Sequence, residues 1–300
     1  MATHATADFY AAVDPVVNRE FYGLEADREP SQFDKIFKIS STDEPQKSAV
    51  EYGGPLQLDL KAENAAVAGK SIVQGPIKGW TTNTHAANMV LSFEAVADVK
   101  YAKIKSAAGS IGRATRQTPE YIARDFLDRA FNSAYPQTAW SLELCSDVHK
   151  LPDGVTTTSN ELATPAALDE TSVEDIMTLG RNILAPDGGR GPERVKQIIV
   201  PTALWVVAEK LSMNPKTSGS AFNDPSVIKG FKVQVFDYLT SNTRWFAQTH
   251  NSDGLFWDWI QKAQFITDQV PLNLQKVYIA YFRSRIGCVN FRGILGSAAS

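Results

Sequence analysis

The stretch that decides the fold is residues 95–133, which read AVADVKYAKIKSAAGSIGRATRQTPEYIARDFLDRAFNS. Its second half carries apolar residues at the spacing of one helix face, namely Ile122, Phe126, Leu127, Ala130 and Phe131. Thr118 is suited to cap this segment, and Pro119 to occupy its first helical position. The first half has a looser apolar stripe and contains glycines that weaken an isolated helix. The stretch therefore predicts one long helix, broken or kinked near Pro119, that depends on packing.

The preceding segment, residues 53–92, predicts a long two-stranded excursion from the body. Leu56, Leu58 and Leu60 alternate with polar residues, which is the period of a strand. Small and turn-forming residues follow, and the alternation returns near Met89. Such a ribbon has little apolar material for a core of its own and is marginally stable in water. We therefore expect it to be covered, either by a neighbouring subunit or by its own domain.

Residues 1 to about 50 are polar and irregular, which is typical of an arm rather than of a compact domain. Asp14 and Pro15 predict the start of a short helix. The following stretch is expected to be extended, with apolar side chains at Phe33, Ile36, Phe37 and Ile39. A subunit that lays an arm across its neighbours begins in this way, whereas a monomeric enzyme seldom does.

Residues 134–169 are predicted as loop with short strands, and a compact α/β section follows. Asp169 leads an amphipathic helix, residues 197–200 form a buried strand, and Pro201 opens a second helix. The remainder is strand-rich, with strands expected over residues 231–239, 243–248, 255–260 and 264–267 and a long β region over residues 276–295. Its aromatic side chains are expected in the core or in a subunit interface: Phe231, Phe236, Tyr238, Trp245, Phe246, Phe256, Trp257 and Trp259. These elements predict an α+β fold.

Composition places the chain among globular proteins. Its 300 residues allow two subdomains, and 43% hydrophobic with 21% charged residues argue against general disorder. A formal net charge of -3 gives no electrostatic reason for tight nucleic-acid binding. Residues 1–6 lack the basic and apolar regions of a secretory signal, and Met1 leads us to expect no removed propeptide. No apolar run approaches the about 18 residues that cross a bilayer.

No motif predicts catalytic or cofactor chemistry. The turn at residues 187–191, DGGRG, joins a helix to a strand and lacks the Lys-Ser or Lys-Thr of a phosphate-binding loop. A GxSxG nucleophile motif is absent from the sequence. Cys145 and Cys288 form no CxxC pair and are expected to be small buried apolar residues.

The histidines are far apart in the sequence: His4, His85, His149 and His250. A metal trio or a Cys145–His149 pair stays open at this stage, because such sites assemble in three dimensions. The residues around Cys145 and His149 predict loop, so solvent-exposed histidines are the preferred interpretation. We therefore expect no catalytic, cofactor-binding or metal-binding residues.

The order of these parts resembles the HK97-fold major capsid proteins of tailed bacteriophages, and among them the Mu-like head subunits. One stretch, residues 93–132, is similar to the end of the family's hairpin and its spine helix. Residues 154–160 resemble the Gly/Thr/Ser-rich segment after that helix, and residues 198–208 resemble the strand, proline and helix of the axial domain. Residues 281–293 resemble the closing β region with its arginines and glycines. The resemblance spans most of the chain. It lies in the order of the elements and in the kinds of residues that they contain, without an invariant signature motif.

This resemblance implies a division of the chain. Residues 1–52 would be the N-terminal arm and residues 53–92 the extended loop. Residues 93–169 would form the peripheral domain with the spine helix, and residues 170–269 the axial domain. Residues 270–300 would return to the peripheral domain.

The resemblance also implies a non-enzymatic function, that of a major capsid protein. Such a subunit self-assembles through hexamers and pentamers into an icosahedral shell that encloses phage double-stranded DNA. Its implied partners are copies of itself, a portal, in some cases a decoration protein, and DNA contacted without sequence specificity, with no membrane partner. Because the chain lacks a long charged helical N-terminal extension, a separate scaffolding protein is expected. The implied location is the virion, after assembly in the host bacterial cytoplasm.

Three other functions stay open. An encapsulin-like nanocompartment shell would share the fold and package a protein instead of a genome. A soluble α/β hydrolase or transferase would need a pocket with converging polar groups. A tail or decoration protein could be equally rich in strands but would not need the long helix.

Overall fold

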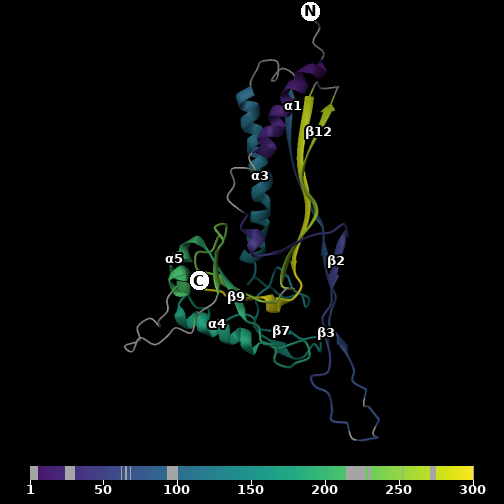
Figure 1. Ribbon diagram of the computed structural model, residues 1–300, viewed down its shortest axis with the longest axis vertical. Helices are drawn as coiled ribbons and strands as arrows, with labels where there is room; N and C mark the ends of the chain where they lie inside the picture. Colours follow the sequence, from purple (N-terminus) through teal and green to yellow (C-terminus); the bar gives the residue numbers. More distant parts are fainter. Residues whose placement is uncertain are drawn as a thin grey trace, which may run out of the picture.

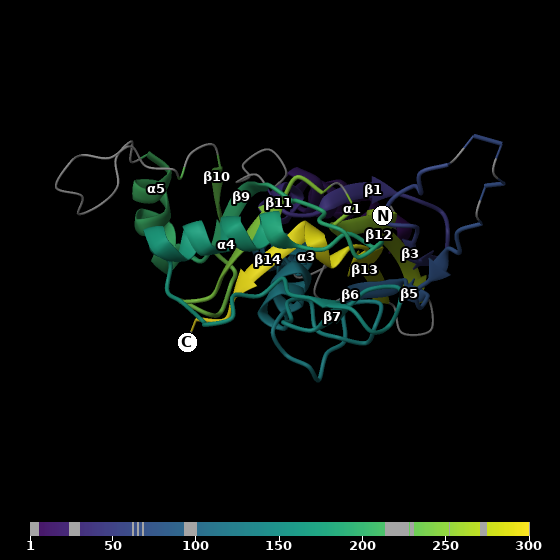
Figure 2. The same cartoon turned by 90° about the horizontal axis from the view of Figure 1, so that it is seen from below.

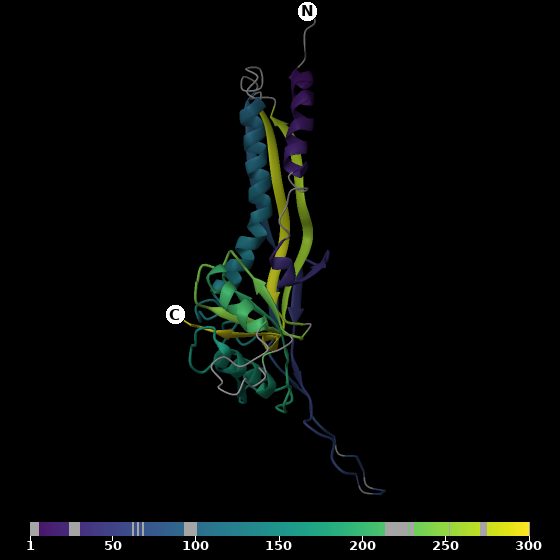
Figure 3. The ribbon, with the colours of Figure 1, turned by 60° about the vertical axis from the view of Figure 1, so that its left-hand side comes forward.

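The computed structural model describes most of the chain, namely residues 6–23, 31–61, 63–64, 66–67, 69–92, 101–213, 228, 231–251, 253–270 and 275–299. A tall part made of two helices and long strands rises from a compact α/β part (Figure 1). A thin loop projects from the compact part in the opposite direction (Figures 1 and 3). The molecule therefore has a body with two extensions.

The tall part is built on a four-stranded sheet in the order β1-β12-β13-β6. Its centre is the antiparallel pair β12 (Leu255–Val270) and β13 (Gln275–Cys288). The edges are β6 (Asn83–Ser92), which is antiparallel to β13, and β1 (Lys38–Ser41), which is parallel to β12. The two strands expected over residues 255–260 and 264–267 are thus one long strand with register shifts near Gln261.

One face of this long sheet is covered by α3 (Tyr101–Asp128) and α1 (Thr6–Gly23), which lie along it (Figures 1 and 3). Their shared core contains Val17, Met89, Leu91, Ile104, Ala108 and Tyr278. The predicted long helix is confirmed, but it continues through Pro119 and is not capped by Thr118. The Thr118 hydroxyl instead donates a hydrogen bond to the carbonyl of Ala114, one turn earlier, at 2.6 Å. The part of the predicted helix before residue 101 lies outside the described residues.

The compact part is built on a second four-stranded sheet in the order β10-β9-β11-β14. Its strands are β9 (Val195–Val200), β10 (Lys232–Val235), β11 (Trp245–Thr249) and β14 (Ile294–Ser297). They confirm the buried strand expected at residues 197–200 and the strands expected near residues 231–239 and 243–248. The long β region expected to residue 295 is instead divided, because the short helix η4 (Phe291–Gly293) separates β13 from β14.

Two helices pack on one face of the compact sheet, α4 (Glu170–Asn182) and α5 (Trp205–Met213). The 3-10 turn η2 (Thr202–Leu204) leads directly into α5 after Pro201. Asp169 caps α4, because its carboxylate accepts a hydrogen bond from the backbone N–H of Ser172 at 2.7 Å. Both predicted helix starts are therefore confirmed.

A single apolar core joins the two sheets. Ile199, Phe246 and Ile294 of the compact sheet meet Leu255 and Trp257 of the long sheet, together with the C-terminal turns of α3. Most of the aromatic cluster expected in a core is buried in the subunit, including Trp245 and Phe256. This continuous packing makes the tall and compact parts one body.

The N-terminal segment differs from the extended arm that the sequence predicts. The helix α1 begins at Thr6 and runs through Pro15 instead of starting there. After residues that lie outside the described part, the short helix η1 (Phe33–Lys35) and the residues that follow it enter the common core. Phe33, Ile36 and Phe37 are buried there, because their large apolar side chains fill the space between α3 and the long sheet.

The excursion over residues 46–81 is a two-part ribbon. Its first part pairs β2 (Gln46–Ala49) with β5 (Lys78–Thr81), and its second pairs β3 (Tyr52–Gly53) with β4 (Val73–Gln74). Among the described residues of 54–72, hereafter the loop tip, no strand is present. The strand predicted from the alternation of Leu56, Leu58 and Leu60 was therefore wrong.

The division into arm, peripheral and axial domains stays a prediction, and the two sheets do not follow its boundaries. The strand β12 begins inside the expected axial range but belongs to the long sheet. The strand β14 lies in the expected peripheral return but pairs with β11 in the compact sheet. The chain thus crosses from one sheet to the other before residue 255 and again after residue 288.

Candidate assembly surface and its anchors

The loop tip carries a group of apolar side chains that the rest of the subunit leaves uncovered. Leu56 is 62% exposed, Leu58 88% and Leu60 101%, and Val67 and Ile72 are also exposed. An apolar patch on a protruding loop of this kind marks an interaction site more often than a free surface. The loop tip and α5, which also exposes apolar side chains, lie on opposite sides of the molecule in the view of Figure 2.

The base of the loop tip rests against the turn between α4 and β9. In this turn Ala185 donates its N–H to the carbonyl of Gly189 at 2.7 Å, and Gly188 has a φ of +81°. A Cβ on Gly189 would lie 2.4 Å from a methyl group of Leu56, and one on Gly53 would lie 2.7 Å from the carbonyl of Pro186. The glycine-rich turn of residues 187–191 is therefore a helix-to-strand turn, as predicted, and it also makes room for the ribbon.

Arg292 fixes the same base from the C-terminal side. Its side chain is 3% exposed, pairs with the carboxylate of Glu51 and donates to the carbonyl of Leu184 at 2.6 Å. The backbone carbonyl of Glu51 in turn accepts a hydrogen bond from the N–H of Gly75 across the ribbon at 2.8 Å. One buried guanidinium thus connects the ribbon, the α4–β9 turn and η4.

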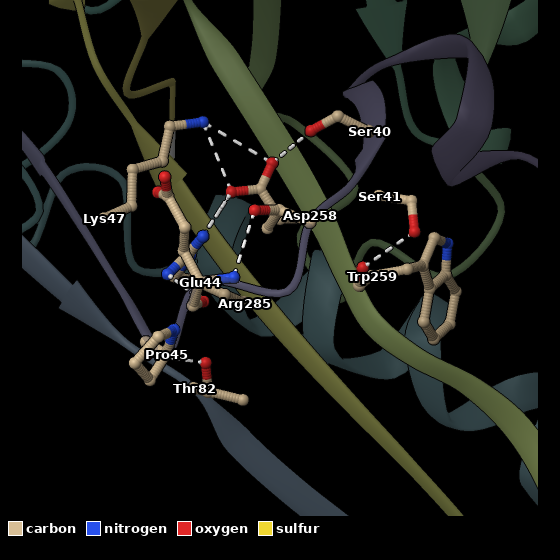
Figure 4. Close-up of polar contacts among 10 residues, drawn as sticks. Ser40, Ser41, Glu44, Pro45, Lys47, Thr82, Asp258, Trp259 and Arg285 are labelled. Atoms are coloured by element: carbon tan, nitrogen blue, oxygen red, sulfur yellow. Dashed lines mark hydrogen bonds and ion pairs between the residues drawn. The ribbon is translucent and has the colours of Figure 1, made fainter.

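A second buried cluster connects β2 to β1, β12 and β13 of the long sheet (Figure 4). Asp258 accepts hydrogen bonds from Nε and Nη2 of Arg285 at 3.2 and 2.9 Å and from the hydroxyl of Ser40. Lys47 of β2 adds an ion pair to the same carboxylate at 3.2 Å and lies 3.8 Å over the ring of Phe256. Burial acts to raise the pKa of Asp258, but hydrogen bonds from Ser40 and Arg285 and the Lys47 charge outweigh it and lower this pKa.

Two further contacts hold the N-terminal segment. The buried ammonium of Lys276 pairs with Asp14 of α1, and the hydroxyl of Tyr278 donates to the same carboxylate at 2.8 Å. Glu120 of α3 accepts hydrogen bonds from the backbone N–H groups of Gln32 at 2.9 Å and Phe33 at 3.1 Å. Burial raises the pKa of Glu120 despite these hydrogen bonds. The backbone at the start of η1 is therefore held against α3 by these hydrogen bonds.

The histidines are not assembled into a metal or catalytic site in the described part of the chain. No group of three or more His, Cys, Asp or Glu side chains there has metal-binding geometry, and His4 lies outside it. His149 is not the solvent-exposed loop residue that the sequence predicts. Its ring is buried and stacks on Phe291 at 4.0 Å, and burial lowers its pKa to about 4.

Cys145 and Cys288 are buried, as predicted, and neither forms a disulfide. Burial raises the pKa of the Cys145 thiol well above its usual value and that of Cys288 to about 12. A neutral buried thiol is a poor nucleophile, so a Cys145–His149 catalytic pair is not supported. Across the described residues, no helix is both long and apolar enough to span a membrane.

Sequence reasoning missed the residues that anchor the ribbon. Asp258 lies between two tryptophans, whereas Arg285 lies between Ser284 and Ile286 in a strand that also contains Arg283. A charged residue flanked by large apolar residues in a predicted strand is a usable signal for a buried ion pair, because isolated charges are rarely buried. The partner of each charge could not have been read from the sequence.

Comparison with known proteins rests on structure, since neither a family model nor a curated protein sequence matches this sequence. A chain of Microbacterium phage Oxtober96 matches 91% of this chain and 93% of its own, with a TM-score of 0.52 and 8% identity. The capsid of a native GTA particle matches 91% of both chains, with a TM-score of 0.53 and 13% identity. The procapsid of bacteriophage JBD30 matches 97% of this chain and 75% of its own, with a TM-score of 0.50 and 11% identity.

The chain has the HK97-like capsid fold. The fold class predicted from the sequence is therefore confirmed, whereas the Mu-like type stays a prediction. The stretches on which the sequence resemblance was based lie in α3, in the loop before α4, in β9 to α5, and in β13 to η4. The identities of 8–13% carry the fold and no residue-level function.

Proposed function

We propose that this protein is a major capsid subunit that assembles through hexamers and pentamers into an icosahedral shell around phage double-stranded DNA. The observation that carries the proposal is the capsid fold over about nine-tenths of the chain, 91% in the match to phage Oxtober96. The exposed apolar loop tip supports it, because a closed lattice provides a neighbour that covers such a patch.

The energetics of a lattice fit this surface. Burying one leucine side chain contributes about 1.5–3 kcal/mol, so a loop tip gives a modest contact on its own. In a ring every subunit gives one such contact and receives another, and the contacts become strong together through multivalency. Weak single contacts also allow a subunit to leave a wrong position during assembly.

The partners and location follow from this function and belong to the proposal. Copies of the same chain are the main partner, with a separate scaffolding protein, a portal, in some cases a decoration protein, and DNA held without sequence specificity. The formal net charge of -3 fits a shell that faces DNA without gripping it. The place of action is the virion, after assembly in the cytoplasm of the host bacterium.

Negative-stain electron microscopy of the purified protein, with light scattering for mass, tests the proposal. Closed shells or rings of five and six subunits support it. A monodisperse monomer that persists at high concentration with scaffolding protein added contradicts it and favours the soluble-enzyme alternative.

The content of the particles separates the proposal from an encapsulin-like shell. The solved structures that this fold resembles include a bacteriophage procapsid, which favours a genome as the content. Particles isolated from producing cells are expected to contain nuclease-protected DNA. Particles that contain one protein and no DNA would favour the nanocompartment.

A further inference from the structure

Residues 31–37, hereafter the strap, lie across the junction of the tall part and the compact part. Their apolar side chains are buried in the core that joins the two sheets. Gln197 of β9 donates a hydrogen bond to the carbonyl of Lys35 at 2.9 Å. Gln248 of β11 donates one to the carbonyl of Ile36 at 2.8 Å. The second half of the strap is therefore fixed to the compact sheet.

The first half, residues 31–33 and hereafter the strap entry, is held by one carboxylate of the tall part. Glu120 of α3, which is 6% exposed, accepts hydrogen bonds from the backbone N–H groups of Gln32 at 2.9 Å and Phe33 at 3.1 Å. It also accepts one from the Ser31 hydroxyl at 2.9 Å. All three donors belong to the strap entry, so the carboxylate exchanges these hydrogen bonds for water when the entry moves away.

The strap entry is also linked to the compact part, through the side chain of Gln32. Its amide donates to Oδ2 of Asp237 at 2.6 Å and accepts a hydrogen bond from the backbone N–H of Asp237 at 2.9 Å. The Thr202 hydroxyl, in η2, donates to the other oxygen of this carboxylate at 2.7 Å. The entry thus links α3 of the tall part to the segment after β10 and to η2.

Among the described residues, no cation pairs with the Glu120 carboxylate. Arg116 and Arg124 lie one turn before and after it on α3, and each directs its guanidinium to another acceptor. Lys35 of the strap and Asp237 of the compact part are exposed, so solvent screens their charges. The Glu120 charge is therefore buried without a positive partner.

The groups around Glu120 make its charged form costly. Asp34 of the strap is a second carboxylate, and the long sheet places the rings of Trp257 and Trp259 against Phe33. Burial raises the pKa of Glu120, and the Asp34 charge adds to this shift, although the three hydrogen bonds oppose it. Burial also raises the pKa of Asp34. The closed strap therefore binds protons more tightly than an open one.

We propose that the strap entry is a releasable link between the tall part and the compact part, and that proton uptake by Glu120 strengthens this link. When the entry moves away, the Glu120 carboxyl meets water and its pKa returns toward the ordinary value of 4.5. Because the pKa is higher in the closed state, a proton favours that state. The link is therefore weaker at pH 7, where the carboxylate is charged, and becomes stronger as the pH falls toward 5.

Hydrogen exchange of the unassembled full chain tests this link, because the N–H groups of Gln32 and Phe33 are protected while Glu120 accepts their hydrogen bonds. Exchange is measured by mass spectrometry at pH 7.5 and pH 5, and each rate is divided by the intrinsic rate at that pH. The peptide that spans residues 31–37 is expected to gain about threefold in protection at pH 5.

The internal control is the peptide that spans α4, residues 170–182, which is expected to gain no protection at pH 5. Protonation of the buried His149 weakens the whole subunit as the pH falls, so it acts in the opposite direction to the expected gain in the strap. A general effect of acid on stability is therefore distinguished from proton uptake at Glu120.

Three variants assign the effect. Glu120→Gln is expected to remove most of the gain at pH 5, and Asp34→Asn a smaller share, because Asp34 raises the pKa of Glu120 and takes up a proton itself. Asp34 is exposed, so its variant keeps the test available where Glu120→Gln does not fold. Gln32→Ala breaks the link to Asp237 and is expected to lower the protection of the strap at both pH values while the gain persists.

The inference concerns the subunit itself and does not depend on the proposed function. A strap peptide that gains no protection at pH 5, or a gain that both Glu120→Gln and Asp34→Asn leave intact, would overturn it. Either result would leave the proposed capsid function standing, because that function is tested by the particles that the protein forms.

Discussion

Asp258 and Arg285 are direct cross-strand partners in the centre of the long sheet, and their side chains are only 2% and 1% exposed. Ser40 occupies the paired position on the other side of Asp258, so the three residues form one row across β1, β12 and β13. Removing two charges from water costs free energy, and the attraction within the pair and the hydrogen bonds around it offset this desolvation cost. The row also receives Lys47, so it fixes the direction in which the ribbon leaves the body.

Arg285→Met is expected to destabilise the subunit by about 3–5 kcal/mol, because it leaves the Asp258 carboxylate buried with a weaker set of partners. The double variant Asp258→Leu/Arg285→Met is expected to lose less free energy of unfolding than this single variant, since no buried charge stays unpaired. Urea unfolding followed by circular dichroism measures both free energies of unfolding. Equal losses for the single and the double variant would show that the penalty does not come from the unpaired charge.

Gly287→Ala is expected to destabilise the subunit by about 1–3 kcal/mol through overpacking. A Cβ at this position would lie 2.4 Å from Nε1 of Trp80 and 2.8 Å from the ring of Phe256, two side chains that pack edge to face. The matched control is Gly54→Ala, where a Cβ meets nothing within 4 Å and little change is expected. Thermal unfolding of both variants measures the difference, and similar melting temperatures would contradict the predicted clash.

The fold was predictable from the sequence where local patterns and tertiary packing agree. The long helix and the strand at residues 195–200 have strong apolar periodicity, and both are present. The break expected at Pro119 is absent because the helix is packed on both sheets, and this packing outweighs one lost backbone hydrogen bond. Leu56, Leu58 and Leu60 mimic a strand, but without a sheet face to pack against the alternation has no structural effect.

The candidate site was predictable in place but not in detail. The exposed ribbon could be recognised from its small residues and its shortage of apolar material. The ion pairs that anchor the ribbon could not be recognised, because their members are far apart in the sequence. Arg292 and Glu51 are 241 positions apart, and Lys47 and Asp258 are 211 positions apart. A buried His149 was missed for a similar reason, since Phe291, on which it stacks, belongs to η4 near the C-terminus.

His149 is expected to make the stability of the subunit depend on pH. Its pKa is about 4 in the folded state and 6.5 in the unfolded chain, so the unfolded chain binds a proton that the folded state does not. The stability contribution is complete above pH 6.5 and is lost as the pH falls from 6.5 toward 4, by up to about 3 kcal/mol.

The variant His149→Phe keeps an aromatic ring against Phe291 and removes the titration. Its free energy of unfolding is expected to fall less than that of the unmodified protein between pH 7 and pH 4.5, measured by urea unfolding. The control His250→Gln changes an exposed histidine and is expected to keep the unmodified pH dependence. A pH dependence that His149→Phe leaves unchanged would assign the effect to carboxylates instead.

Glu51→Ala is expected to loosen the base of the ribbon and to expose the loop tip to proteases. The substitution leaves the buried Arg292 guanidinium without its carboxylate, which we expect to cost about 3 kcal/mol. Chymotrypsin cleavage after the exposed leucines of the loop tip should become several times faster, measured by mass spectrometry of the unassembled subunit. The control Asp59→Ala breaks only the exposed Asp59–Lys70 pair within the tip, where about 0–1 kcal/mol is at stake. Equal cleavage rates for the two variants would mean that Arg292 stabilises the C-terminal region alone and does not hold the ribbon in place.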